Sequence, residues 1–279
     1  MLTATTSLAR RIEQAESGLI AGMGRSAAHR LGSDQVIVSS IGGGAAVMPS
    51  PRSPLSKVSG LGFEPLDEAA LDAVEAEFAR FQTPVRVELS SLGDPAVGKL
   101  LSRRGYALSG FENVLGLSLG SPAALAPART AAVVVIERPS PQDVPVWIEV
   151  ITTGFMHPDT FDGPSTAEPV DPALIEPVFQ DIALLEGYSQ YLARRDGQLA
   201  GAASMRIHEG VAQLCGAATL PGHRRLGIQT ALLRERLVHA AHAGCDVAIV
   251  TTEPGSKSQE NVQRQGFELL YVRAIMIKP

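Results

Sequence analysis

The chain has 279 residues, of which 45% are hydrophobic and 19% are charged, and its formal net charge is −5. This length allows one large domain or two of ordinary size, each able to bury a core. The weak negative charge argues against nucleic acids and anionic membranes as partners, because both are bound through concentrated positive charge.

The cysteines and the N-terminus indicate a reducing compartment. Cys215 and Cys245 are the two cysteines, and neither belongs to a closely spaced pair, so the sequence has no zinc signature and no disulfide framework. We therefore expect a cytoplasmic protein that holds no metal. Arg10, Arg11 and Glu13 interrupt the N-terminal segment, unlike a secretory signal. No apolar run reaches the roughly 18–20 residues of a membrane helix.

The first quarter of the chain predicts helices followed by two short strands. We expect a helix that Thr5 or Thr6 caps and that extends toward residue 21, and a short helical piece at residues 26–31. Strands are predicted at residues 36–38 and 45–48, on either side of a glycine triplet at 42–44. Because prolines and not a helix follow this triplet, we interpret it as a turn and not as a phosphate loop.

The next segment, to residue 122, alternates helices and strands. Residues 66–81 predict a helix whose buried stripe is Leu71, Val74 and Phe78. Residues 85–89 alternate as a half-buried strand, a short helix starts at Pro95, and residues 106–119 predict one or two strands.

Two distant segments share one pattern. Residues 100–119 and 261–279 each contain a basic helix end, a glycine-aromatic pair and then an apolar stretch that we interpret as a hairpin. We interpret this similarity as an internal repeat. The Pro- and Ala-rich residues 123–130 are the predicted linker, so the expected domains are residues 1–122 and 131–279.

The second predicted domain begins with a strand at residues 131–136 and a helix that starts after Ser140 and ends near residue 155. The proline-rich residues 157–172 are interpreted as a loop on the substrate side, and residues 173–185 as a helix. Three strands follow at 188–194, 199–207 and 211–220, joined by Asp-Gly and Glu-Gly turns. The last predicted elements are a strand at 247–252, a helix at 258–265, and strands at 268–272 and 273–277.

The turn at residues 221–227 lies between the strand 211–220 and a helix with Leu233, Leu237 and Ala241 at four-residue spacing. The first backbone N–H groups of a helix have no internal partner and carry partial positive charge, which makes an anion site suited to phosphate. Gly227 lets an anion approach the backbone, and Arg224 and Arg225 add positive charge.

This turn resembles the acyl-CoA-binding motif of the GNAT superfamily of N-acetyltransferases, Arg/Gln-x-x-Gly-x-Gly/Ala. Arg224 and Gly227 match its first and fourth positions, whereas Gln229 stands at the sixth, where the family has Gly or Ala. The element order over residues 130–279 also resembles the superfamily, and residues 1–120 resemble it loosely without the motif. The resemblance implies an α/β (α+β) protein of two tandem GNAT-like domains, each a mixed, mostly antiparallel sheet flanked by helices. The N-terminal copy would be degenerate and bind no acyl-CoA.

The resemblance also implies the donor site for acetyl-CoA. The pantetheine would pair with the backbone of Ala218, Thr219 and Leu220, in a gap where the strands 211–220 and 247–252 splay apart. The main-chain amides that would hold the pyrophosphate are those of Arg225, Leu226, Gly227, Ile228, Gln229 and Thr230. Asn261 resembles an asparagine that contacts CoA in some relatives.

In the reaction that this family implies, an amine attacks the thioester carbonyl directly in a ternary complex. The backbone N–H of Ala217 or Ala218 would hold the oxyanion, and we place it at Ala218. Many relatives use a tyrosine as the acid, but that position is Val262, so water is the alternative. The candidate bases are Glu253, His157, Glu176, Asp181 and His208. We favour Glu253, which ends a splayed strand, and we interpret Cys215 as a core residue and not a nucleophile.

The predicted function is therefore acetyl-CoA-dependent N-acetylation of a primary amine on a small molecule or a peptide. Two alternatives stay open. One is a non-catalytic acyl-CoA-binding or sensing protein, and the other is a scaffold that binds no CoA. Aminoglycosides, polyamines, amino acids and protein amines are all open as acceptors. The sequence also leaves open whether the chain forms a homodimer.

Overall fold

The computed structural model describes residues 2–51, 53–120, 134–157 and 172–279. Their contacts form two compact units. The first contains Met1–Gly116 and Thr251–Pro279, and the second contains the described residues of Leu117–Thr160 and Asp171–Val250. The predicted linker 123–130 and most of the predicted loop 157–172 lie outside the described residues. Each unit is considered by itself below.

The first unit is a mixed sheet with helices on both faces. Its strands run in the order β1-β2-β3-β4-β12-β5, and only the β3–β4 pair is parallel. The strands are β1 (Ile37–Ile41), β2 (Gly44–Met48), β3 (Lys57–Ser59), β4 (Val85–Ser90), β5 (Ala107–Ser118) and β12 (Glu268–Lys278). The helices are α1 (Thr6–Leu31), α2 (Glu68–Arg80), α3 (Pro95–Arg103) and α7 (Lys257–Gln263).

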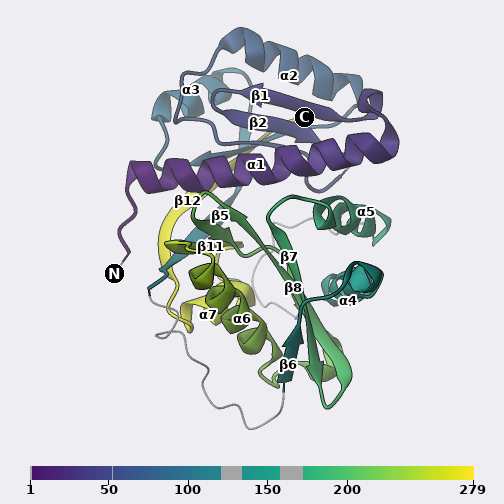
Figure 1. Cartoon of the computed structure of the whole chain (residues 1–279). Coiled ribbons are helices and arrows are strands. Elements are labelled where there is room, and N and C mark those ends of the chain that lie inside the picture. Colours follow the sequence, from purple (N-terminus) through teal and green to yellow (C-terminus); the bar gives the residue numbers. More distant parts are fainter. Residues whose placement is uncertain (1, 52, 121–133, 158–171) are drawn as a thin grey trace. The chain divides into compact units, whose positions relative to one another are not determined.

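Helices α1 and α2 cover opposite faces of the β1–β2 hairpin (Figure 1). Thr5 caps α1 by accepting a hydrogen bond from the N–H of Leu8 at 3.1 Å, as predicted. The helix then continues to Leu31 without the predicted break, because Gly24 lies against Val38 and Val47, where a Cβ would come within 2.8 Å of both side chains. A tertiary contact thus explains a glycine that local propensity would count against a helix.

The opposite face of this hairpin holds the main core of the unit. The predicted stripe of α2, Leu71, Val74 and Phe78, is buried there. Gly42 and Gly43, with φ of 51° and 76°, form the two-residue turn between β1 and β2, so the glycine triplet belongs to a hairpin turn as expected.

The internal repeat is confirmed in local structure, but the predicted hairpins are wrong. In each copy a short helix, α3 or α7, leads through a glycine in the left-handed region, Gly105 (φ 89°) or Gly266 (φ 92°), into one long strand. These strands, β5 and β12, pair with each other, and β12 also pairs with β4. Each residue of a strand with partners on both edges can form hydrogen bonds to a neighbouring strand. Two register shifts interrupt the pairing of β12 with β5.

A buried ion network lies between α1 and the strands of the first unit. The guanidinium of Arg273, which is fully buried, bonds Glu13 and Glu112, each at 2.8 Å. The ammonium of Lys57 bonds Glu16 at 2.7 Å and Glu88 at 2.8 Å. The hydroxyl of Tyr271 donates to Glu13 at 2.7 Å. Four carboxylates therefore share the buried cations Arg273 and Lys57, and Glu88 also pairs with the more exposed Arg86 at 3.5 Å.

The strands of the second unit run in the order β11-β9-β8-β7-β6, with β10 pairing β8. Only the β9–β11 pair is parallel. The strands are β6 (Val134–Glu137), β7 (Tyr188–Arg195), β8 (Gln198–His208), β9 (Val211–Gln213), β10 (Ala217–Thr219) and β11 (Val247–Thr252). The helices α4 (Val144–Met156) and α5 (Pro172–Ala183) lie on one face of this sheet, and α6 (Ile228–His242) lies on the other (Figure 1).

Both predicted hairpin turns of the second unit are present. Asp196-Gly197 and Glu209-Gly210 have all four φ angles positive, between 46° and 78°. This is the conformation of two-residue turns whose twist matches that of the strands they join. Within the described ranges, no helix is both long and apolar enough to cross a membrane.

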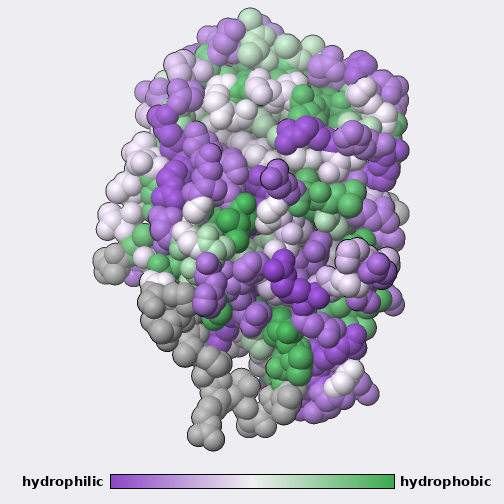
Figure 2. All heavy atoms as spheres, in the orientation of Figure 1, coloured by the Kyte–Doolittle hydropathy of each residue, from purple (hydrophilic) through white to green (hydrophobic). Residues whose placement is uncertain are grey.

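The surface visible in Figure 2 does not indicate which face would bind a partner. Figure 2 shows hydrophobic and hydrophilic residues interspersed in small patches over the coloured residues of one side. A permanent interface is commonly marked by a larger continuous apolar patch. A homodimer therefore stays a prediction.

A half-buried histidine makes the second unit sensitive to acid. The hydroxyl of Tyr191 shares a hydrogen bond with Nδ1 of His239 on α6. Burial, and then the nearby Arg138, lower the pKa of His239 below its usual 6.5. A lowered histidine pKa means that the folded state binds the proton less tightly than the unfolded state does, so stability is lost as the pH falls below about 6.5.

We therefore expect His239→Gln to flatten the acid side of the stability profile. The effect should stay below about 1 kcal/mol, because the imidazole is partly exposed to solvent. Urea unfolding followed by Trp147 fluorescence between about pH 5 and 8 measures it. Equal pH dependence in the wild type and the variant would contradict this prediction.

Candidate functional site

The strand predicted at residues 211–220 is divided by a β-bulge. β9 pairs Gln213 with Arg206, and β10 pairs Ala217 with Ala203. Three residues separate the two positions on this strand, whereas two residues separate their partners on β8, so one residue is extra. Gly216, with φ of 39°, lies within this insertion.

Beyond the bulge the strand has an open edge. The parallel β9–β11 ladder covers Val247–Ile249, and the N–H of Leu214 donates to the carbonyl of Ile249 at 2.8 Å. After this bond, β10 pairs with β8 alone among the described strands. The ladder thus separates where the sequence predicts a gap for the pantetheine.

The register decides which amides face this open edge. The N–H of Leu220 donates to Ala200, and the carbonyl of Gly216 accepts from Ser204, both at 3.0 Å. Residues of an antiparallel pair alternate between hydrogen-bonded and non-hydrogen-bonded positions. The main-chain groups of Ala218, midway between these two bonds, therefore point toward β8. Those of Ala217 and Thr219 point toward the open edge.

The glycine turn leads into α6 as predicted. A short 3-10 turn, Pro221–His223, is followed by Arg225 (φ 58°) and Gly227 (φ 81°), and the helix begins at Ile228. No side chain of the described residues caps this helix start. Left-handed residues ahead of a helix start turn main-chain N–H groups toward one concavity, an arrangement that suits an anion.

The turn also has room for a ligand. A Cβ built on Gly227 would meet no heavy atom of the described residues within 4 Å. The side chains of Arg225 and Leu226 are exposed, and that of Ile228 is buried beneath the turn. The residues present therefore fit the diphosphate that the sequence predicts.

We expected the side chain of Arg224 to add positive charge at the anion site, but it contacts the end of α4. Its guanidinium donates a hydrogen bond to the carbonyl of His157, the C-cap residue that follows α4. A cation at a helix C-terminus is favoured by the helix dipole. Arg224 therefore joins the turn to α4, and Nδ1 of His157 bonds the carbonyl of Thr153 at 2.9 Å.

The other candidate bases are dispersed. Glu253 follows β11 and Asn261 lies on α7, both in the first unit, so their places relative to the turn stay predictions. Asp181 is 3% exposed, and His208 ends β8. Val262, at the position of the expected acid, is buried and carries no ionisable group.

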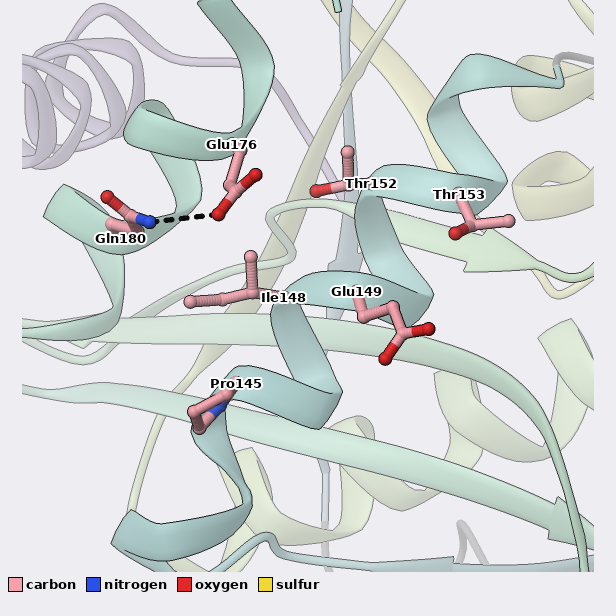
Figure 3. A pocket seen from close by; sticks show the side chains of 7 residues that line it. All are labelled: Pro145, Ile148, Glu149, Thr152, Thr153, Glu176 and Gln180. Atoms are coloured by element: carbon pink, nitrogen blue, oxygen red, sulfur yellow. Dashed lines mark hydrogen bonds between the residues drawn. The ribbon is translucent and has the colours of Figure 1, made fainter. Parts of the chain in front are cut away.

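A pocket of about 550 Å³ lies between α4 and α5 (Figure 3). It is lined by Pro145, Ile148, Glu149, Thr152, Thr153, Glu176 and Gln180. Two of these residues are acidic and none is basic, so the pocket suits a cation with an apolar part. Figure 3 shows the hydroxyl of Thr152 and the carboxylate of Glu176 facing each other across it. The Thr152 hydroxyl oxygen is buried and has no hydrogen-bond partner among the described residues.

The sequence singled out Glu176 but missed Glu149 and Thr152. Their sequence spacing could have indicated them, because residues 145, 148, 149, 152 and 153 lie on one side of a helix. That spacing says nothing of the second helix, which supplies the facing wall. Among the described residues, no group of His, Cys, Asp and Glu is arranged to hold a metal ion.

Comparison with known proteins agrees with this geometry. Residues 157–267 match the family model described as the Acetyltransferase (GNAT) family. A GCN5-related N-acetyltransferase from Kribbella flavida is 20% identical, with a TM-score of 0.62 over 92% of this chain and 95% of that chain. A tandem GNAT protein from the clavulanic acid biosynthesis pathway is 14% identical, with a TM-score of 0.61 over 99% of this chain and 96% of that chain. No curated protein sequence matches the chain.

The chain has the mixed α/β fold of solved acyltransferases, and the family model matches its residues 157–267. More specifically, residues 157–267 resemble the GNAT family, and the fold is similar to that of a tandem GNAT protein. The resemblance seen in the Arg224–Gly227 turn is thereby confirmed, and so is the predicted fold class.

Proposed function

We propose that the second domain is an acetyl-CoA-dependent N-acetyltransferase that acts on a primary amine by direct attack in a ternary complex. The observation that carries this proposal is the start of α6 behind Gly227, which no side chain of the described residues caps. In our proposal the amides from Arg225 to Thr230 bind the diphosphate, with Asn261 as a further CoA contact. We keep the proposed boundaries at residues 1–122 and 131–279, and only the second domain binds acyl-CoA.

The register refines the oxyanion site within this proposal. Ala218 directs its N–H toward β8, so we transfer the oxyanion role to Ala217, whose N–H points to the open edge. The pantetheine then pairs with Ala217 and Thr219, and no longer with Ala218 and Leu220. As the amine nitrogen bonds the acetyl carbon, the C–S bond breaks and the CoA thiolate takes a proton. Glu253 stays our proposed base for the ammonium.

We place the acceptor in the pocket between α4 and α5. The carboxylates of Glu149 and Glu176 would hold an ammonium group there, and Ile148 and Pro145 would contact an apolar body. This favours a small aliphatic or aromatic amine over an acidic substrate. The pocket lies on α4, and Gly154 of this helix packs directly against Ala218 on β10.

A panel assay of CoA release tests this function. With acetyl-CoA and cationic amines, we expect Glu176→Gln to raise the KM for the amine about 10-fold, because one charge-assisted hydrogen bond is lost. The KM for acetyl-CoA should stay unchanged. Glu186→Gln, a change of an exposed carboxylate outside the pocket, is the matched control. Equal amine KM values in both variants would show that the pocket is not the acceptor site.

The same assay discriminates the alternative function. Val262 at the position of the expected acid favours a protein that binds acyl-CoA and does not turn it over. Calorimetric binding of acetyl-CoA without CoA release on any amine would support that reading. No binding of acetyl-CoA at all would reject both.

A further inference from the structure

Ser204 on β8 lies opposite the bulge and donates hydrogen bonds to the carbonyl groups of the bulged residues. Its backbone N–H is shared between two carbonyls, those of Cys215 at 3.2 Å and Gly216 at 3.0 Å. Its hydroxyl donates a further bond to the Cys215 carbonyl at 2.7 Å. One residue therefore satisfies both carbonyls that the extra residue displaces from the regular ladder.

Two buried side chains hold Ser204 from opposite faces of the sheet. On the α4 face, the hydroxyl of Tyr188 donates to Oγ of Ser204 at 2.5 Å. Burial raises the pKa of Tyr188, so this phenol stays protonated and remains a donor. On the α6 face, the guanidinium of Arg236 donates to the Ser204 carbonyl at 3.0 Å. Burial lowers the pKa of Arg236 to about 10, which still leaves it a cation at neutral pH.

The bonds of Ser204 fix the direction of the Ala217 amide. The carbonyl of Gly216 and the N–H of Ala217 belong to one planar trans peptide group, so they point in opposite directions. Because Ser204 holds that carbonyl on the β8 side, the Ala217 N–H must point to the open edge of β10. Gly216 permits the left-handed φ that this arrangement needs.

We propose that Ser204, held by Tyr188, is a positioning residue that aims the Ala217 N–H at the thioester carbonyl oxygen of the acyl donor. This inference rests on the proposed function and assigns the hydroxyl pair a role in catalysis. Neither hydroxyl touches the reacting atoms. They act one peptide group away: the Ser204 hydroxyl holds the Cys215 carbonyl, which keeps the Ser204 N–H in place on the Gly216 carbonyl of the peptide group that carries the Ala217 N–H.

Ser204→Ala should therefore slow the chemistry and leave donor binding intact. It removes the hydroxyl bond to the Cys215 carbonyl and deprives Tyr188 of its acceptor, while the turn at Gly227 is untouched. A displaced oxyanion donor costs rate because its alignment is needed in the transition state. We expect kcat to fall on the order of 10–100-fold and the Kd for acetyl-CoA to change less than about 3-fold.

Infrared spectroscopy of the bound donor tests the inference without any acceptor amine. With acetyl-CoA that carries a carbon-13 label in its acetyl carbonyl, the carbonyl stretch should move to lower frequency on binding to the wild type. This shift should shrink in Ser204→Ala and, to a smaller extent, in Tyr188→Phe, which provides a second test should Ser204→Ala fold poorly. Ser189→Ala is the matched control, because it removes a buried serine hydroxyl on β7 that accepts from Arg138 at 3.0 Å.

The outcomes separate the two proposals. If the wild type does not bind acetyl-CoA, the proposed function fails and this inference fails with it. If acetyl-CoA binds and the carbonyl shift is the same in the wild type, Ser204→Ala and Tyr188→Phe, the donor site stands and the positioning role is wrong. A full shift in Ser189→Ala together with a reduced shift in Ser204→Ala supports the role.

Discussion

Gly227→Glu is expected to weaken acetyl-CoA binding at least about 100-fold, which corresponds to about 2.7 kcal/mol. The new carboxylate would occupy the open space in front of the α6 start, where the diphosphate is proposed to lie. Two charges at 4 Å repel each other by about 4 kcal/mol at an effective dielectric constant near 20. Isothermal titration of acetyl-CoA into the wild type and the variant measures the loss.

Gly244→Glu is the matched control for this variant. Gly244 ends the same helix with φ of 79°, close to the 81° of Gly227, and a Cβ there also meets no described atom within 4 Å. Both variants therefore pay the same cost of about 1–2 kcal/mol for a side chain in the left-handed region. The control should bind acetyl-CoA like the wild type. Equal loss in both would mean that backbone strain, and not the anion site, explains the effect.

The turn could be predicted from sequence because its determinants are local. Pro221 and Gly222 end the strand, Gly227 supplies a left-handed residue, and the helix begins at Ile228. Helix starts and tight turns depend on a few neighbouring residues. The turn that we propose to bind the diphosphate could therefore be predicted without knowledge of the rest of the chain.

The orientation of the amide that we propose to bind the oxyanion could not be predicted in this way. Whether Ala217 or Ala218 faces the open edge depends on the bulge at Gly216, because one inserted residue reverses the direction of every later amide on the strand. The bulge itself is held by Ser204 and Tyr188, which lie on two other strands. Cross-strand partners of this kind leave no periodic signal in the sequence.

The single strand β12 was missed for a related reason. Residues 268–277 have the composition of two short strands, and the sequence places them in the second domain. The structure inserts β12 between β4 and β5, which precede it by more than 150 residues. Pairing between such distant segments is decided by the whole fold, whereas the glycine-aromatic pair at Gly266-Phe267 is a local signal and was recognised.

Arg273 on β12 is expected to be the residue whose replacement costs the first unit most. Burial works against its charge, but Glu13 and Glu112 outweigh this and raise the pKa of Arg273 well above its usual value. In Arg273→Met, Glu13 and Glu112 would lose the guanidinium that they share, while Lys57 and the longer pair with Arg86 would remain on the other side of the network. Removal of one partner from a buried ion pair typically costs about 3–5 kcal/mol. Hydrogen exchange of α1 and β12 peptides in urea would localise this loss to the first unit.

The pH dependence and two further variants test this explanation. Burial, and then Glu88, raise the pKa of Glu112, so this carboxyl protonates readily as the pH falls and no longer needs a counter-charge. The penalty of Arg273→Met should therefore shrink from neutral pH toward about pH 4.5. Glu13→Gln in the same chain should recover part of it at neutral pH. Arg80→Met, which breaks an exposed pair with Glu77, should cost less than about 1 kcal/mol. A penalty that grows on acidification, or that equals the Arg80→Met cost, would show that packing and not charge governs this site.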